Sequence, residues 1–378
     1  MTTAISPFTA NVPQADLDDL QARLARTRFA TGLPNAGWTQ GVPEDYARSL
    51  VETWKNDFDW RAWEAKLNAY PQFTTEIDGQ SIYFLHIRSK VETATPLVLF
   101  HGWPSSIFEF LDVIEPLTDP VAHGGNESDA FHLVIPSVPG FGFSGVTTES
   151  GWNSSRIGAA IAELMTRLGY DRFGTQGGDY GAFVAADVAR SVPDRVIGVH
   201  LNAATFGFIP FHELGEEELA SLTPVEQARI GRLQNYMNDG NGYFQIQATR
   251  PQTVAYGLTD SPVGQLTWIA EKFYDWASPK GSIDLDLVLA HATLYWLTET
   301  AVSTARTYWE AMHSGSWPTP VSTPTGVAVF AEDVAIRRYG EDGYNIVHWS
   351  DFETGGHFAP TEVPDLYVAD IRRFFGSL

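Results

Sequence analysis

Asp179 stands among glycines in a segment that could carry a reactive side chain. The run Gly177-Gly178-Asp179-Tyr180-Gly181 follows an expected strand and precedes an expected helix. A nucleophile at such an elbow has a strained backbone, and small flanking residues are needed because neighbouring backbones approach closely. A serine there indicates ester chemistry, whereas a carboxylate attacks a saturated, electrophilic carbon and forms an alkyl ester. The alternative is a glycine-rich turn in which Asp179 only caps the helix.

Two backbone N–H groups are expected beside this carboxylate. His101-Gly102-Trp103-Pro104 follows the apolar run PLVLF, where this type of elbow places a loop that donates one N–H. The residue after the nucleophile would supply the second. We therefore expect the N–H groups of Trp103 and Tyr180 to form an oxyanion hole, in which each donor is worth roughly 3–4 kcal/mol. His101 itself is expected to be a structural hydrogen-bonding residue.

His357 is the candidate general base. It follows two glycines after the last expected strand, the third position in the order nucleophile, acid, histidine. An imidazole that titrates near neutral pH is suited to take a proton from water. The acid that orients it should follow the run VAVF, where Glu332 and Asp333 stand side by side and spacing alone does not separate them. Asp351 and Glu353 fall within or at the end of a strand, so we expect them to be solvated or structural.

Composition excludes several other chemistries. The chain has no cysteine, which removes disulfides and thiol nucleophiles, and its ten histidines show no HExxH pattern or other ligand spacing, so no metal is expected. A net charge of −22 disfavours nucleic acids and anionic membrane surfaces and favours neutral substrates. No apolar run reaches the roughly 18–20 residues that span a bilayer, and the first residues do not form a signal peptide. We expect a soluble, cytoplasmic protein.

A sheet is needed to hold these residues. Continuous apolar runs, typical of strands buried on both faces, alternate with helical stretches, which predicts an α/β fold with a mostly parallel central sheet flanked by helices. Asp78-Gly79 favours a hairpin, and Asn153 is the expected cap of a helix that ends near Leu168. The strands expected to be buried on both faces are PLVLF from Pro96, FHLVIP from Phe131 and VIGVHL from Val196, and the strand signal returns at VAVF from Val327 and NIVHW from Asn345.

The pattern divides the chain into four segments. Residues 1–72 form a helical arm, with helices after Pro13 and Pro43. We expect the aromatic side chains of the arm to pack on the core, because their apolar surface is too large to leave in water. Residues 73–205 and 319–378 are the two parts of the core. Between them, residues 206–318 lose the strand signal and form an inserted helical lid. Its aromatic residues suit either a core or a pocket for a bulky apolar substrate, and they include Trp268, Phe273, Trp276 and Trp296.

Over nearly its whole length the chain resembles the microsomal-type epoxide hydrolases, a family with the α/β-hydrolase fold that includes juvenile hormone epoxide hydrolases and soluble microbial enzymes. The resemblance rests on the arm and on HGWPSS, IPSVPGFGFSG, GGDYGAF, QATRPQTVAYGLTDSPVGQL, PTGVAVFAED and GGHFAP. It implies that Asp179 is the nucleophile, His357 the base and Asp333 the charge-relay acid. It also implies that two lid tyrosines, Tyr243 and Tyr308, protonate the opening epoxide oxygen. The hydrophobic N-terminal anchor of membrane-bound members is not found here, which supports a soluble member.

The resemblance implies an epoxide hydrolase, which converts an epoxide and water to a vicinal diol through an ester on Asp179 and needs no cofactor. A haloalkane dehalogenase would use the same aspartate, but a tryptophan commonly follows the nucleophile in that family where Tyr180 stands here. Chloride release would identify it. A non-catalytic ligand-binding protein of this fold would bind an epoxide without forming diol. The sequence leaves open which epoxide is the substrate and whether the chain forms a homodimer.

Overall fold

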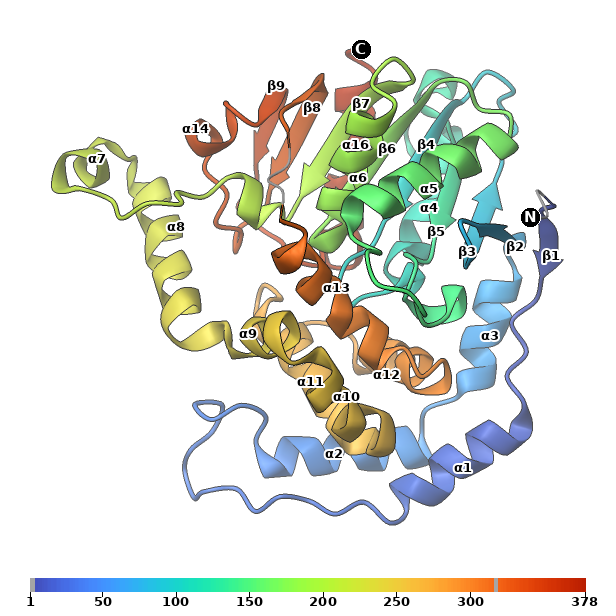
Figure 1. Cartoon of the computed structure of the whole chain (residues 1–378), viewed down its shortest axis with the longest axis vertical. Coiled ribbons are helices and arrows are strands. Elements are labelled where there is room, and N and C mark those ends of the chain that lie inside the picture. The colour runs from blue at the N-terminus through green and yellow to red at the C-terminus, as the bar shows by residue number, and fades with distance from the viewer. Residues whose placement is uncertain (1–3, 316–318) are drawn as a thin grey trace.

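The computed structural model describes residues 4–315 and 319–378, and within them nine strands form one sheet (Figure 1). The first three residues of the predicted arm and the last three of the predicted lid lie outside these ranges. Each of the expected runs forms a strand. The strands are β1 (Ser6–Phe8), β2 (Gln72–Ile77), β3 (Gln80–Ile87), β4 (Thr95–Phe100), β5 (Phe131–Pro136), β6 (Phe173–Gly178), β7 (Val196–Asn202), β8 (Val321–Val329) and β9 (Tyr344–Asp351).

The larger part of the sheet is parallel, as predicted. The strand order is β1-β2-β3-β5-β4-β6-β7-β8-β9; the pairs from β5 to β9 are parallel and those from β1 to β5 antiparallel. The expected hairpin joins β2 to β3, and Asp78 and Gly79 both take positive φ in its turn. Because β4 lies between β5 and β6, the connection from β4 to β5 runs one way along the sheet and the connection from β5 to β6 runs the other way. Ligands of open α/β sheets bind at the carboxyl ends of the strands at such a point.

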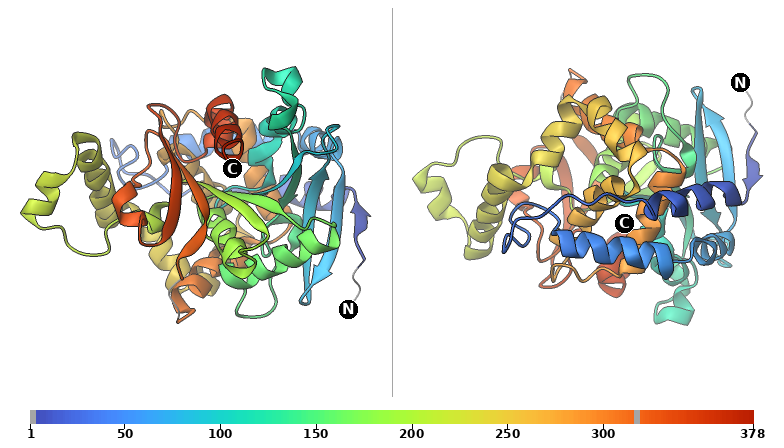
Figure 2. Two further views of the ribbon diagram at one scale, coloured as in Figure 1. Left: turned by 90° about the horizontal axis from the view of Figure 1, so that it is seen from above. Right: turned by 90° about the horizontal axis from the view of Figure 1, so that it is seen from below.

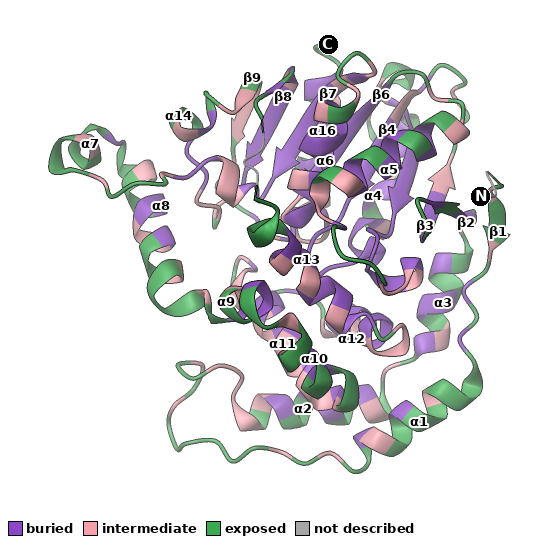
Figure 3. Ribbon diagram, viewed as in Figure 1, coloured by how far each residue is buried: buried purple, intermediate pink, exposed green. Residues whose placement is uncertain are grey.

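Helices cover both faces of the sheet. Figure 2 shows α5 (Ser154–Arg167) and α6 (Tyr180–Ser191) together on one face and α4 (Leu111–Thr118) and α16 (Pro364–Phe375) on the other. The predicted cap of α5 is present, because the side chain of Asn153 accepts a hydrogen bond from the N–H of Arg156 at 3.0 Å. The central strands are the most completely buried part of the molecule (Figure 3). Two short helices, α14 (Arg337–Gly340) and α15 (Ala359–Glu362), lie in the second part of the core.

In its described residues the inserted segment consists of helices and the loops that join them, with no strand, and it lies at one end of the sheet (Figure 1). Among the described residues, no helix of the lid, the arm or the core is long and apolar enough to cross a membrane. The lid helices are α7 (Glu216–Ser221), α8 (Pro224–Asn235), α9 (Gly242–Thr249), α10 (Pro251–Asp260), α11 (Pro262–Asp275), α12 (Leu285–Leu297) and α13 (Ala301–His313).

The arm contacts the lid as well as the core. Its helices are α1 (Gln14–Leu24), α2 (Glu44–Asn56) and α3 (Trp60–Asn68). The indole N–H groups of Trp54 and Trp63 donate to Thr293 and Asp286 of α12. Trp63 also packs on Phe108 of the core, with ring centroids 5.2 Å apart. The arm was predicted to pack on the core, and its contacts with the lid and its strand β1, a three-residue edge strand that pairs with β2, were not predicted. Three residues are too few to give a periodic signal.

Candidate active site

The strained elbow that the sequence predicts is present at Asp179. The residue has φ 54° and ψ −126° between β6 and α6, a conformation that L-residues rarely adopt. The neighbouring glycines are needed because an added Cβ on Gly177 would lie 2.1 Å from the carbonyl oxygen of Gly181. One on Gly181 would lie 2.3 Å from the carbonyl oxygen of Phe100. The close approach of β4, β6 and α6 therefore determines which residues can occupy this turn.

The carboxylate of Asp179 points toward the HGWP loop and not along its own helix. Its Oδ1 accepts a hydrogen bond from the backbone N–H of Trp103 at 2.9 Å, and its Oδ2 lies 3.4 Å from Nε2 of His357. It accepts no capping hydrogen bond from α6, which contradicts the alternative that Asp179 only caps the helix. Tyr180 opens α6, so its N–H is among those that a helix N-terminus leaves without an intrahelical acceptor.

His357 is brought to Asp179 by a glycine turn after β9. Gly355 has φ 82°, and a Cβ on Gly356 would lie 2.5 Å from the carbonyl oxygen of Trp276 in the lid. The backbone N–H of His357 donates to that same oxygen at 3.0 Å. Burial works against the charged imidazole, but the hydrogen bond and charge of Asp179 outweigh it and raise the pKa of His357. The base candidate is thus tied to both the nucleophile candidate and the lid.

The two acids that spacing could not separate differ in burial. Glu332 is exposed, whereas Asp333 is partly buried, and its Oδ1 accepts the N–H groups of Val334 and Ala335 at 2.6 and 3.0 Å. Burial raises the pKa of Asp333, and its charge is one of those that raise the pKa of His357. Of the remaining acids, Asp351 is exposed and paired with Arg229, and Glu353 is exposed. The geometry favours Asp333 over Glu332.

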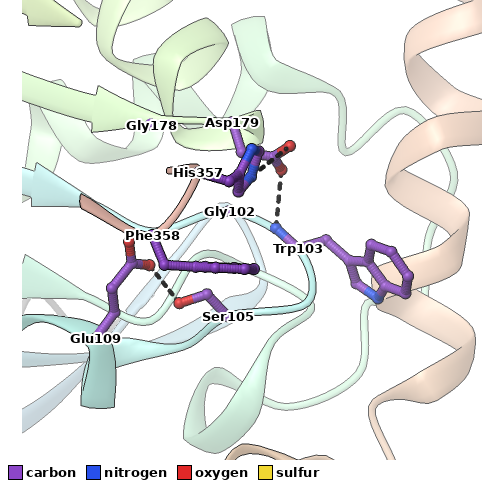
Figure 4. A pocket seen from close by; sticks show the side chains of 8 residues that line it. All are labelled: Gly102, Trp103, Ser105, Glu109, Gly178, Asp179, His357 and Phe358. Atoms are coloured by element: carbon purple, nitrogen blue, oxygen red, sulfur yellow. Dashed lines mark hydrogen bonds and ion pairs between the residues drawn. The ribbon is translucent and has the colours of Figure 1, made fainter. Parts of the chain in front are cut away.

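A small cavity lies beside Asp179 and His357 (Figure 4). It leaves about 10 Å³ for the centre of a water molecule, which is room for roughly one water. Glu109 of the 3-10 helix Ile107–Phe110 lines it and accepts a short hydrogen bond from Ser105. Burial raises the pKa of Glu109 to about 7. The full lining is Gly102, Trp103, Ser105, Glu109, Gly178, Asp179, His357 and Phe358.

The two lid tyrosines lie in one aromatic cluster over the HGWP loop. Tyr243 of α9 stacks on Trp103 with centroids 5.1 Å apart, and Tyr308 of α13 lies edge-on to both rings at 6.0 Å. Burial raises the pKa of each phenol well above its usual value, and the charge of Asp179 adds to this. The hydroxyl of Tyr236 lies 3.1 Å from that of Tyr243. The structure thus brings the two tyrosines together near the nucleophile candidate.

Other predicted features of the site also have a place in the structure. His101 is buried, and its Nε2 accepts the N–H of Val138 at 3.2 Å, so the structural role expected of it is confirmed. Burial lowers its pKa to about 4. Among the described residues no cluster of three or more His, Cys, Asp or Glu side chains is placed to hold a metal ion. Of the lid aromatic residues, Trp276 lies beside His357, with their ring centroids 4.8 Å apart. Phe273 is buried against His291 and Phe358.

Sequence reasoning missed several residues at the site. Ser105 and Glu109 lie in the stretch SSIFEF after HGWP, where the one available signal was a carboxylate inside an apolar run. Tyr236 falls in a π-helical turn, Tyr236–Gly240, and π-turns are frequent at functional sites but leave no simple pattern in a sequence. None of these residues has a spacing that relates it to Asp179, because the folding of the core brings Ser105 and Glu109 to the site and the packing of lid on core brings Tyr236.

Comparisons with known proteins identify the relatives of this chain. The family described as "Epoxide hydrolase N terminus" matches residues 5–110, and the family described as "alpha/beta hydrolase fold" matches residues 95–257. A protein of Stigmatella aurantiaca named as an epoxide hydrolase is 45% identical over 99% of this chain and 85% of its own length. Epoxide hydrolase 1 of Sus scrofa is 34% identical over 99% of this chain and 89% of its own.

Solved structures give the same result. The epoxide hydrolase of Aspergillus niger superimposes with a TM-score of 0.88 at 31% identity, over 99% of this chain and 96% of that one. The juvenile hormone epoxide hydrolase of Bombyx mori also gives 0.88, at 30% identity, over 100% of this chain and 95% of that one. Likeness of this extent covers arm, core and lid together. The chain therefore belongs to the epoxide hydrolase family, within the α/β-hydrolase fold.

Proposed function

We propose that this protein hydrolyses an epoxide to a vicinal diol through a covalent ester on Asp179. One observation carries the proposal: a carboxylate on a strained elbow has one oxygen held by the N–H of Trp103 at 2.9 Å and the other 3.4 Å from Nε2 of His357. The first oxygen is held where it can remain a carbonyl oxygen, and the second is directed toward the base. Such a pair suits attack on carbon followed by hydrolysis.

In the first step Oδ2 of Asp179 bonds to one carbon of the epoxide ring while the bond from that carbon to the ring oxygen breaks. The ring oxygen takes a proton from Tyr243 or Tyr308, which leaves a hydroxyalkyl ester and a phenolate. Because burial raises the pKa of both phenols, they are fully protonated before the reaction and give up the proton only to an alkoxide.

In the second step a water molecule in the cavity loses a proton to His357 and attacks Cγ of Asp179. The negative charge that forms on Oδ1 is stabilised by the N–H groups of Trp103 and Tyr180. When the ester C–O bond breaks, the departing alcohol oxygen takes the proton from His357. The regenerated carboxyl group of Asp179 returns its proton to the phenolate through solvent, so the sum of the steps is one epoxide and one water to one diol.

Formation of the ester also prepares the base. In the free protein the charge of Asp179 raises the pKa of His357 against the effect of burial. The ester has no such charge, so burial then favours the neutral imidazole. A base that becomes neutral when its water is to be activated needs no conformational change.

The test is a single turnover with excess protein in water enriched in oxygen-18, with styrene-type, aliphatic and polycyclic epoxides as probes. We expect the label in the carboxylate of Asp179. Label found only in the diol would show direct attack of water on the epoxide and would overturn the ester. In His357→Gln the ester should persist, visible as a mass increase equal to that of the epoxide. His123→Gln, at an exposed histidine of the 3-10 helix Pro120–His123, is the matched control and should turn over normally.

A further inference from the structure

Lys272 of α11 is a buried cation that the proposed mechanism does not use. The residue is only 4% exposed. Its Nζ lies 4.6 Å from the ring centroid of Tyr243 and 5.8 Å from that of Trp276. Lysine is almost never fully buried unless it is paired, because an ammonium group loses its hydration inside a protein. A buried lysine over two aromatic rings of the site therefore needs an explanation beyond packing.

The ion pair of Lys272 does not account for its position. Oε1 of Glu271 lies 3.1 Å from Nζ, but the Glu271 side chain is 28% exposed and that of Lys272 is 5% exposed. A lysine that needed only this partner could reach it nearer the surface, since its long stem lets the charged end extend to water. The ammonium has three donors, so the pair leaves part of its charge directed at the rings.

The charge of Lys272 can act on the ring of Tyr243. Burial and the charge of Asp179 both hold the phenol protonated. Those effects keep the proton in place before reaction but also oppose its transfer. A phenolate spreads its negative charge over the ring, and a cation at the ring attracts that charge. The titratable and charged groups that face the phenol are Asp179 from the elbow, Tyr236 from the π-helical turn, Tyr308 from α13 and Lys272 from α11, with Glu271 beside the last.

We propose that Lys272 is a positioning residue that acts through Tyr243, by stabilising the negative charge that develops on its ring as the epoxide opens. The inference rests on the proposed function, in which Tyr243 or Tyr308 donates a proton to the ring oxygen, and it assigns that donation to Tyr243. Lys272 forms no bond and transfers no proton. It makes the phenol a better acid only in the step in which the ester forms, and hydrolysis of the ester does not depend on it.

The experiment measures ester formation and ester decay separately, in single turnovers with styrene oxide followed by mass spectrometry. Lys272→Met keeps the length of the side chain without its charge, and Lys272→Arg keeps the charge. We expect Lys272→Met to slow ester formation by about 10- to 100-fold, part of what a general acid contributes, with decay within about twofold of wild type. Lys272→Arg should recover most of the rate. Glu271→Gln removes the competing anion, so its ester formation should be at least as fast as that of wild type.

A Tyr243→Phe background separates this inference from the proposed function. If Lys272 acts through the phenol, Lys272→Met adds little to the loss that Tyr243→Phe already causes. An equal loss in both backgrounds, or equal slowing of formation and decay, would show a packing role and overturn the inference alone. Wild-type ester formation in Tyr243→Phe would overturn both it and the role of the phenol. Should Lys272→Met not fold, Glu271→Gln decides, because slower ester formation in that variant contradicts the inference.

Discussion

Gly181→Ala tests whether the elbow is as tightly packed as the structure shows. The new Cβ would lie 2.3 Å from the carbonyl oxygen of Phe100, about 1 Å short of the 3.4 Å at which ordinary contact begins. The obstructing atoms belong to the backbone of the central strand β4, so they cannot rotate away as a side chain would. Alanine gains about 0.5–1 kcal/mol over glycine in a helix, but overpacking costs about 1–3 kcal/mol or more. We expect a net loss of about 2 kcal/mol in the free energy of unfolding.

Activity should fall further than stability. If α6 moves by about 1 Å to relieve the contact, Asp179 moves with it, and a misplacement of this size costs about 100-fold in rate. Urea unfolding followed by tryptophan fluorescence measures the first effect, and single-turnover ester formation in the folded protein measures the second. Gly231→Ala in α8 is the control, because nothing lies within 4 Å of its added Cβ. If Gly181→Ala matched this control in both stability and rate, the account of the elbow would be wrong.

Three further predictions concern charge. Asp179→Asn should lower the pKa of His357 in an NMR titration, because it removes the hydrogen bond and charge that raise that pKa; an unchanged pKa would refute the proposed preparation of the base. Asp333→Asn should slow ester decay far more than Glu332→Gln, which alters an exposed neighbour, and equal effects would contradict the choice of Asp333. Asp370 of α16 is fully buried. Burial by itself raises the pKa of its carboxyl group, but hydrogen bonds from His200, Ser350 and His348 outweigh burial and hold this pKa well below the ordinary value. Its stabilising effect is thus present above the unfolded pKa of about 3.9 and lost as pH falls toward the folded pKa. Asp370→Asn should lower the free energy of unfolding by about 3 kcal/mol at pH 7, and the difference from wild type should shrink below about pH 4; the exposed Asp365→Asn on the same helix should show neither effect.

The arm gives the lid a fixed place relative to the core. Trp54 and Trp63 donate hydrogen bonds to α12, while Trp63 packs on Phe108 beside the HGWP loop. The lid in turn holds His357 through the carbonyl oxygen of Trp276. Arm, lid and His357 are therefore connected by direct contacts.

The sequence by itself determined the central architecture. Continuous apolar runs gave the strands of the parallel sheet, since strands buried on both faces cannot carry alternating polar residues. Glycines around Asp179 and before His357 marked the two turns where backbones approach closely or take positive φ, and both turns are present. These requirements are local, so residues close together in the sequence are enough to predict them. The two lid tyrosines, in contrast, followed only from the resemblance to a family, because fourteen tyrosines carry the same phenol.

Only the tertiary structure decided which side chains share the site. Asp333 differs from Glu332 by one position in the chain, but one side chain is turned inward and the other toward water. Glu109 comes from the core, and Tyr236 and Lys272 come from two elements of the lid, so these three residues are near one site only when the lid packs on the core. Burial and the distance between charges govern their chemistry, and neither quantity is set by neighbours in sequence. Spacing can specify a turn, but the electrostatic environment of a carboxylate depends on every element packed around it.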